Sequence, residues 1–146
     1  MRDVARAIVD DNLYLVLATA DAEGRPWASP VYFAHDAYRR FIWVSAPDST
    51  HSRNITVRPA VSIVIFDSRV PVNSGQAVYM SATAEEVAED EREQLAATFS
   101  DRSQQHAAGT WTSADVVAPA RLRLYVATAE EQFVLGERDE RVGVSL

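Results

Sequence analysis

Two hydroxyls, an imidazole and a guanidinium lie within positions 49–53, as Ser49, Thr50, His51 and Arg53. Residues 46–48 interrupt the preceding apolar run, so Ser49 or Thr50 can cap a helix that ends near Arg58, before Pro59. The first turn of a helix has unpaired N–H groups and the positive end of the helix dipole, and both favour an anion. The spacing fits a phosphate site, and it fits equally well an ordinary helix cap with exposed polar neighbours.

The remaining reactive residue types exclude several chemistries. The histidines, His35, His51 and His106, share no spacing typical of a metal site, so we expect no bound metal. The chain has no cysteine, which excludes disulfides and thiolate catalysis, and no lysine, which excludes a Schiff-base enzyme. Ser49 and His51 lack a nucleophile elbow, which disfavours a hydrolase. Gln76 follows a glycine, where its amide can pair with the edge of a planar ring, although a surface glutamine is the commoner outcome.

Charge and hydropathy also limit the partners. The formal net charge of −7 disfavours nucleic acid and an anionic membrane surface as partners. No apolar run approaches the roughly 20 residues of a membrane span, and acids lie near the amino end where a secretory signal would be apolar. We therefore expect a cytoplasmic protein.

The elements that must position these residues are mostly strands. The chain of 146 residues is most simply one domain, residues 1–146. Apolar, β-branched and aromatic runs predict strands over residues 13–20, 26–35, 41–45, 60–67, 76–87, 121–128 and 132–135. Short helices are expected before residue 13, over the polar segment near His51, and around Leu95 and Phe99, followed by a polar loop over 101–118. This order favours a mainly β fold, an antiparallel barrel with peripheral helices.

Four segments carry a family resemblance: ATADAEGRPWASPVYFAHD, FIWVSAPDSTHSRNITVRPAVSIVIFD, GQAVYMSATAEEV and RLRLYVATAEEQFVL. In this order they resemble the small members of the pyridoxamine 5′-phosphate oxidase-like family, which are FMN-binding split barrels. The match covers most of residues 8–136 and is most specific over the strand, turn and helix that end at Pro59. The resemblance implies a six-stranded antiparallel split β-barrel that forms a homodimer, with FMN in clefts between the subunits.

The resemblance also implies a set of FMN-binding residues. They are Pro30, Val31, Tyr32 and Phe33 along the ring, Val44 and Ser45 beside the phosphate, Ser49, Thr50, His51 and Arg53 on the phosphate, and Gln76 on the flavin. Thr50 and His51 stand where family members typically have basic residues. The segment that binds substrate in true pyridoxamine phosphate oxidases is not evident, which argues against vitamin B6 oxidation. No catalytic side chain is assigned, because a flavin supplies its own redox chemistry.

Three functions are compatible with these residues. The first is an FMN-dependent oxidoreductase acting on an unidentified small molecule. The second keeps the fold and uses the deazaflavin coenzyme F-420, whose acidic tail requires a groove rich in arginine. The third is a barrel without catalysis that binds or stores a flavin or haem, since a fold alone does not determine function.

Overall fold

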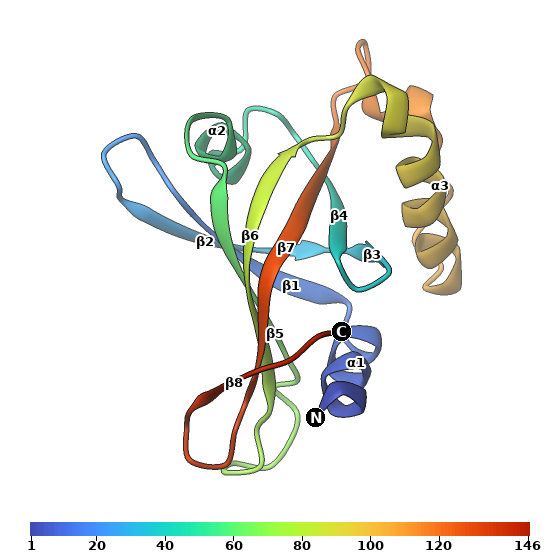
Figure 1. Ribbon diagram of the computed structural model, residues 1–146. Helices are drawn as coiled ribbons and strands as arrows, with labels where there is room; N and C mark the ends of the chain where they lie inside the picture. The colour runs from blue at the N-terminus through green and yellow to red at the C-terminus, as the bar shows by residue number, and fades with distance from the viewer.

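The computed structural model describes residues 1–146 as one antiparallel sheet, strongly coiled, with helices at its periphery (Figure 1). The strands are β1 (Tyr14–Ala20), β2 (Pro26–Tyr32), β3 (Ala34–Asp36), β4 (Arg40–Ser45), β5 (Ala60–Phe66), β6 (Ala77–Glu86), β7 (Arg123–Leu135) and β8 (Arg141–Gly143). The helices are α1 (Arg2–Asp11), α2 (Thr50–Val57), α3 (Glu89–Gln105) and the short 3-10 helix η1 (Ser113–Val116). The strand order is β2-β1-β5-β6-β7-β4-β3, with β8 paired to β7.

The fold class expected from the sequence, an antiparallel split barrel with peripheral helices, is confirmed, although the sheet has eight strands instead of six. One extra strand arises at Phe33, because residues 26–35 form two strands and not one. Up to Tyr32 the chain pairs with β1, and from Ala34 it pairs with β4 at the other end of the strand order. The chain thus passes from one edge of the sheet to the other, which bends the sheet toward a barrel.

Strand β7 is longer than its sequence suggests. Residues 123–135 form one strand where two were expected. The strand continues through a β-bulge opposite Ser81 and Ala82, where Glu130 is the extra residue. Residues 124–127 are all buried, whereas the sequence predicts alternation. The reason is that one face of β7 lies in the barrel and the other lies beneath α3. β8 lies in the tail, where no strand was expected.

Two hydrophobic cores result. The main core fills the barrel and contains Trp43, Phe33 and Phe41, all fully buried, together with Ala5 and Val9 of α1. The second core lies between the sheet and α3, where Leu95 and Phe99 are buried at the expected spacing. Helix α3 continues to Gln105, so the first part of the expected polar loop is helical. None of the helices is long and apolar enough to cross a membrane.

A polar contact joins α1 to the β3–β4 turn, and we call Asp10, His35 and Tyr38 the α1–β3 junction. His35 Nε2 lies 2.9 Å from Asp10 Oδ1, and the Tyr38 hydroxyl donates to Asp10 Oδ2 at 2.6 Å. The Tyr38 N–H donates to His35 Nδ1 at 3.2 Å, and the two rings stack with centroids 4.2 Å apart. These contacts hold Tyr38 at a φ of +55°, beside Ala37 at +51°, in the left-handed region that bulky residues rarely adopt.

Candidate cofactor site

The amino end of α2 brings hydroxyls and an imidazole together. Ser49 is the N-cap, since its Oγ accepts from the Ser52 N–H at 3.3 Å and donates to Ser52 Oγ at 2.7 Å. The Arg53 N–H bonds to the Ser49 carbonyl at 3.0 Å. Because the first N–H groups of a helix have no partner within it, those of Thr50 and His51 remain to bind a ligand. We call Ser45, Ser49, His51 and Ser52 the hydroxyl–imidazole cluster.

His51 lies at the centre of this cluster. Its Nε2 is 2.9 Å from Ser45 Oγ, at the end of β4, and 3.4 Å from Ser49 Oγ. Burial lowers the pKa of His51 below its usual range, because the charged imidazole loses hydration and gains no carboxylate partner. His51 is therefore neutral at pH 7 in the protein alone.

The position of α2 is fixed by contacts of its second half and its carboxyl end. The buried Asn54 side chain donates to Thr19 Oγ1 of β1 at 3.0 Å, and Ile55 packs in the main core. At the helix end, the Arg58 guanidinium donates to the carbonyls of Asp21 and Ala22 at 2.7 and 3.1 Å. The helix is thus anchored to β1 and to the β1–β2 turn, so its first turn is held in place beside the end of β4.

The arginines near α2 differ in whether their guanidinium groups form hydrogen bonds within the chain. Arg58 donates to the two turn carbonyls, and Arg123 of β7 donates to the carbonyls of Ala120 and Leu122 at 2.6 and 2.7 Å. Arg53 is exposed and forms no side-chain hydrogen bond or ion pair within the chain. The cluster therefore fits a phosphate through its hydrogen-bond donors, while Arg53 is the guanidinium free to add charge.

The residues expected along a flavin ring have their side chains on both faces of the sheet. Val31 and Phe33 are buried in the main core, so they can reach a ligand only through backbone atoms. Tyr32 points the other way, packs edge-on against Phe99, and has its hydroxyl 2.8 Å from His106 Nδ1. Pro30 is exposed.

The end of β4 lies next to this strand. Val44 is half-buried beside the second core and directly precedes Ser45 of the cluster. β2, which ends at Tyr32, packs against both α2 and β4. The structure thus joins Ser45 at the end of β4 to His51 of α2, whereas Tyr32 contacts α3 and its following residue His106.

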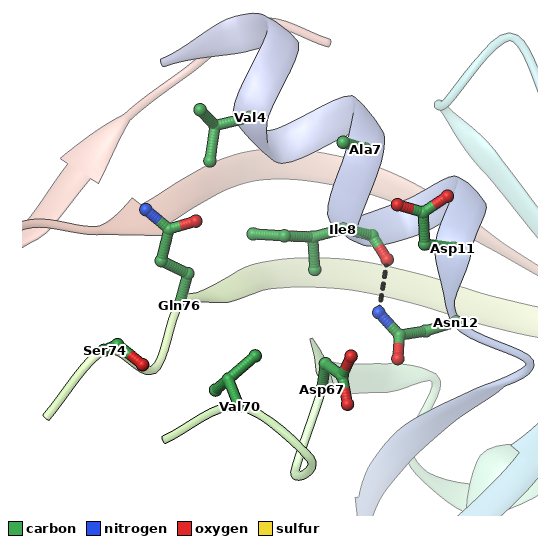
Figure 2. A pocket seen from close by; sticks show the side chains of 9 residues that line it. All are labelled: Val4, Ala7, Ile8, Asp11, Asn12, Asp67, Val70, Ser74 and Gln76. Atoms are coloured by element: carbon green, nitrogen blue, oxygen red, sulfur yellow. Dashed lines mark hydrogen bonds between the residues drawn. The ribbon is translucent and has the colours of Figure 1, made fainter. Parts of the chain in front are cut away.

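Gln76 lies at the other end of the sheet. It lines a groove of about 300 Å³ between α1 and the β5–β6 loop, together with Val4, Ala7, Ile8, Asp11, Asn12, Asp67, Val70 and Ser74 (Figure 2). Glu86, at the far end of β6, lines a different groove beside Ile55 of α2. The 10 residues of β6 place Gln76 roughly 30 Å along the strand from that end. Within one chain, Gln76 does not meet the other expected site residues.

The antiparallel sheet and the polar amino end of α2 are consistent with the family expected from the sequence, and comparisons with known proteins identify that family. The family model of pyridoxamine 5′-phosphate oxidase matches residues 1–135. The chain belongs to this family. No curated protein matches the sequence.

Solved structures share the fold. The haem storage protein HutZ from Vibrio cholerae is 23% identical, with a TM-score of 0.69 over 88% of this chain and 90% of that one. A haem-binding protein from Mycobacterium smegmatis is 19% identical, with a TM-score of 0.74 over 96% of this chain, which spans 55% of that protein. An F420 reductase is 20% identical, with a TM-score of 0.63 over 88% of this chain and 94% of that one. At these identities the likeness shows the fold alone.

Sequence reasoning missed two groups of polar residues. Ser52 follows Ser49 by three positions, the spacing at which an N-cap and the N3 residue interact, so this signal was present in the sequence. The contacts of Asp10 with His35 and Tyr38 join positions more than 20 residues apart, with separations of 25 and 28. No local pattern indicates such a pair.

Proposed function

We propose that this chain binds FMN at the amino end of α2 and functions as a flavin-dependent oxidoreductase acting on a small molecule in the cytoplasm. The hydroxyl–imidazole cluster is the observation that carries the proposal. It places Ser45, Ser49 and His51 side chains and the Thr50 and His51 N–H groups at the positive end of a helix, as a phosphate ester requires. Membership in the pyridoxamine 5′-phosphate oxidase family supports it.

In this proposal the chain supplies binding and orientation. Ser45, Ser49, Thr50 and His51 hold the phosphate, with Arg53 adding charge from the next turn. The backbone of residues 31–33, whose side chains pack alternately in the two cores, provides a rigid edge for the ring. The bound flavin would supply the exchange of electrons with the substrate.

We further propose that the working unit is a homodimer. Gln76 lies too far along β6 to reach the α2 site of its own chain, so a contact with the same flavin requires a second copy. The surface offers apolar residues for such a contact, since Tyr14, Trp27 and Val57 are 57%, 50% and 57% exposed. Light scattering that finds a monomer at micromolar concentration contradicts this arrangement.

The deazaflavin F-420 is a weaker candidate on the charges near α2. Its acidic tail needs several free cations, whereas Arg58 and Arg123 donate to backbone carbonyls, which leaves Arg53 as the free guanidinium on α2 itself. The fold of an F420 reductase is nevertheless similar, so this coenzyme belongs in the first test.

Haem binding is a second candidate because of His106. This exposed residue follows α3 and has Nδ1 2.8 Å from the Tyr32 hydroxyl, which fixes the ring and leaves Nε2 free to bind iron. Tyr32 and Trp111 both pack edge-on against Phe99, so aromatic surface adjoins this histidine. Two proteins of similar fold are named for haem binding or storage.

One experiment separates the candidates. The visible spectrum of the dialysed protein is recorded alone and after gel filtration with FMN, F-420 or haemin in turn. We expect FMN to stay with the protein and to be lost in His51→Ala but not in His106→Ala. A protein that retains only haemin, and loses it in His106→Ala, contradicts the FMN proposal and supports haem binding. Turnover of the FMN-loaded protein with reduced nicotinamide or a dye then tests the oxidoreductase activity.

A further inference from the structure

His51 is an imidazole surrounded by hydroxyls. Its Nε2 lies 2.9 Å from Ser45 Oγ and 3.4 Å from Ser49 Oγ, and its Nδ1 forms no hydrogen bond within the chain. The side chain of Ser52 is 1% exposed and accepts a hydrogen bond from Ser49 Oγ, so it forms the buried part of the cluster. A hydroxyl can donate to a neutral imidazole or accept from a charged one, so the cluster can accommodate both protonation states.

No carboxylate forms an ion pair with His51, and desolvation alone shifts its pKa. The acids of β6 that lie beside α2, Glu85 and Glu86, line a groove with Ile55 and Thr56 of the second half of the helix. On its own segment, Asp48 and Arg53 are exposed and form no ion pair. On β7, Arg123 donates to backbone carbonyls and its Nε lies 3.9 Å from a Glu86 carboxylate oxygen. Tyr125 of the same strand stays neutral, because burial raises the pKa of its hydroxyl.

The strands on the other side of α2 add no charge either. β1 and β2 have Tyr14 and Tyr32 as their titratable groups, and both lie at the strand ends away from Trp27 and Ala20. Asp21, in the β1–β2 turn, has the Arg25 guanidinium at 2.8 Å. The half-buried imidazole is therefore neutral before a ligand binds, in keeping with its lowered pKa.

A phosphate dianion at the amino end of α2 reverses this balance. The free N–H groups of Thr50 and His51 place the anion within reach of the imidazole, and a charge-assisted bond to a protonated imidazole is about twice as strong as a neutral one. Arg53 is the free cation of α2 itself, and it lies in the following turn. The ligand itself thus supplies the negative charge that the cluster lacks.

We propose that binding of a phosphate-bearing cofactor at the amino end of α2 is coupled to the uptake of one proton by His51. This inference rests on the proposed FMN site. The added proton resides on the imidazole, which then donates to a phosphate oxygen and to a serine hydroxyl, so the complex retains one negative charge fewer than the two free partners together. By mass action the affinity falls as pH rises, by at most about tenfold per pH unit between the pKa values of His51 in the free and bound protein.

Calorimetry counts this proton directly. FMN is titrated into the full chain at pH 7.5 in phosphate-free buffers that differ in ionisation enthalpy. The phosphate of FMN, with a second pKa near about 6, is already a dianion at this pH and takes up little proton itself. We expect a dependence of the observed heat on the buffer that corresponds to uptake of close to one proton. His51→Lys is the matched control, since lysine is charged before binding and should show a slope near zero while still binding FMN.

The outcomes are distinguishable. FMN binding with no buffer dependence in the wild type overturns the coupling and leaves the FMN site standing, and so does equal uptake by His51→Lys and the wild type. Failure of FMN to bind the wild type overturns both the proposed function and the coupling. If His51→Lys does not fold, the NMR shift of the wild-type His51 ring proton provides the decision. Movement toward the imidazolium value on adding FMN at pH 7.5 supports the coupling, and no movement rejects it.

Discussion

The protein holds His51 and His35 in opposite environments. At the α1–β3 junction, both ring nitrogens of His35 are engaged, one by the Asp10 carboxylate and the other by the Tyr38 N–H. In the hydroxyl–imidazole cluster, His51 has hydroxyls as partners on one nitrogen and none on the other. The first arrangement is complete within the chain and joins two elements. The second has free donors and no countercharge, which is the condition of a binding site.

The same contrast appears in the backbone and in the carboxylates. The junction holds Ala37 and Tyr38 in left-handed conformations, whereas the residues around His51 follow an ordinary cap and helix. Burial would raise the pKa of Asp10, but hydrogen bonds from Tyr38 and His35 outweigh it and lower the pKa overall. We therefore assign stability to the junction and ligand binding to the cluster.

The largest effect is expected on FMN affinity. His51→Ala removes one charge-assisted hydrogen bond to the phosphate and should weaken binding by about 1.5–3 kcal/mol, or roughly 10- to 150-fold. Thermal stability should change less, because His51 joins α2 to β4 only through one hydrogen bond between neutral groups, to Ser45. Titration calorimetry measures the affinity, with His106→Ala as the control that binds FMN normally. Equal affinities for wild type and His51→Ala remove His51 from the site.

The converse substitution at the junction should affect stability and not binding. Asp10→Ala removes the acceptor of two hydrogen bonds at a half-exposed carboxylate, and we expect a loss of about 1–2 kcal/mol in the free energy of unfolding. Urea denaturation measures it. Asp11→Ala is the matched control, since that neighbouring carboxylate forms no hydrogen bond. A large loss of FMN affinity in Asp10→Ala contradicts the separation of the two regions.

The contribution of Asp10 should depend on pH in one direction. Its pKa is lower in the folded protein than in the unfolded chain, so the folded state is stabilised above the unfolded value, about 4, and loses this stabilisation as pH falls through the folded value. The difference in unfolding free energy between wild type and Asp10→Ala should therefore shrink below pH 4. A difference that grows on acidification contradicts the assignment.

A smaller gain is expected at the strained turn. Ala37 has a φ of +51°, a conformation that glycine adopts without strain, so Ala37→Gly should raise the free energy of unfolding by about 0.5–1 kcal/mol. Ala28→Gly in the extended strand β2 is the control and should be destabilising by a similar amount. Thermal denaturation compares the two variants. If both are destabilised alike, Ala37 carries no strain in solution.

The smallest effect concerns acid stability near the cluster. The pKa of His51 is lower in the folded protein than in the unfolded chain, so the unfolded chain binds more protons and the wild type loses stability as pH falls through about 6.5. His51→Gln should lose less over the same interval. Urea midpoints at pH 7.5 and 5.5 provide the comparison, and identical losses indicate that His51 is not desolvated.

The sequence predicts the regular parts of this fold better than the irregular ones. The strands around Phe41 and Val61 and the helix capped by Ser49 are confirmed, because composition and capping act over a few residues. The change of sheet edge at Phe33 and the bulge at Glu130 are set by pairing with distant strands, which no local pattern records. The sequence likewise indicates the cluster around His51, whose helix residues are neighbours in the chain. It gives no sign of the contact between Asp10 and Tyr38, which are 28 residues apart.

The position of β7 in the sheet has a consequence for the order in which the protein can fold during synthesis. β4 (Arg40–Ser45) pairs in the sheet with β3 and with β7 (Arg123–Leu135), and Phe41 lies opposite Ala127. β1, β2, β5 and β6 can pair as they emerge from the ribosome, and β4 can pair with β3. The other edge of β4 stays unpaired until some 80 further residues have been made, which takes several seconds at about 5–20 residues per second. During this interval Phe41, Trp43 and the amino end of α2 lack one wall of the barrel. A nascent chain arrested before residue 123 should therefore expose these aromatic residues to chaperones, and one arrested after β7 has emerged should conceal them.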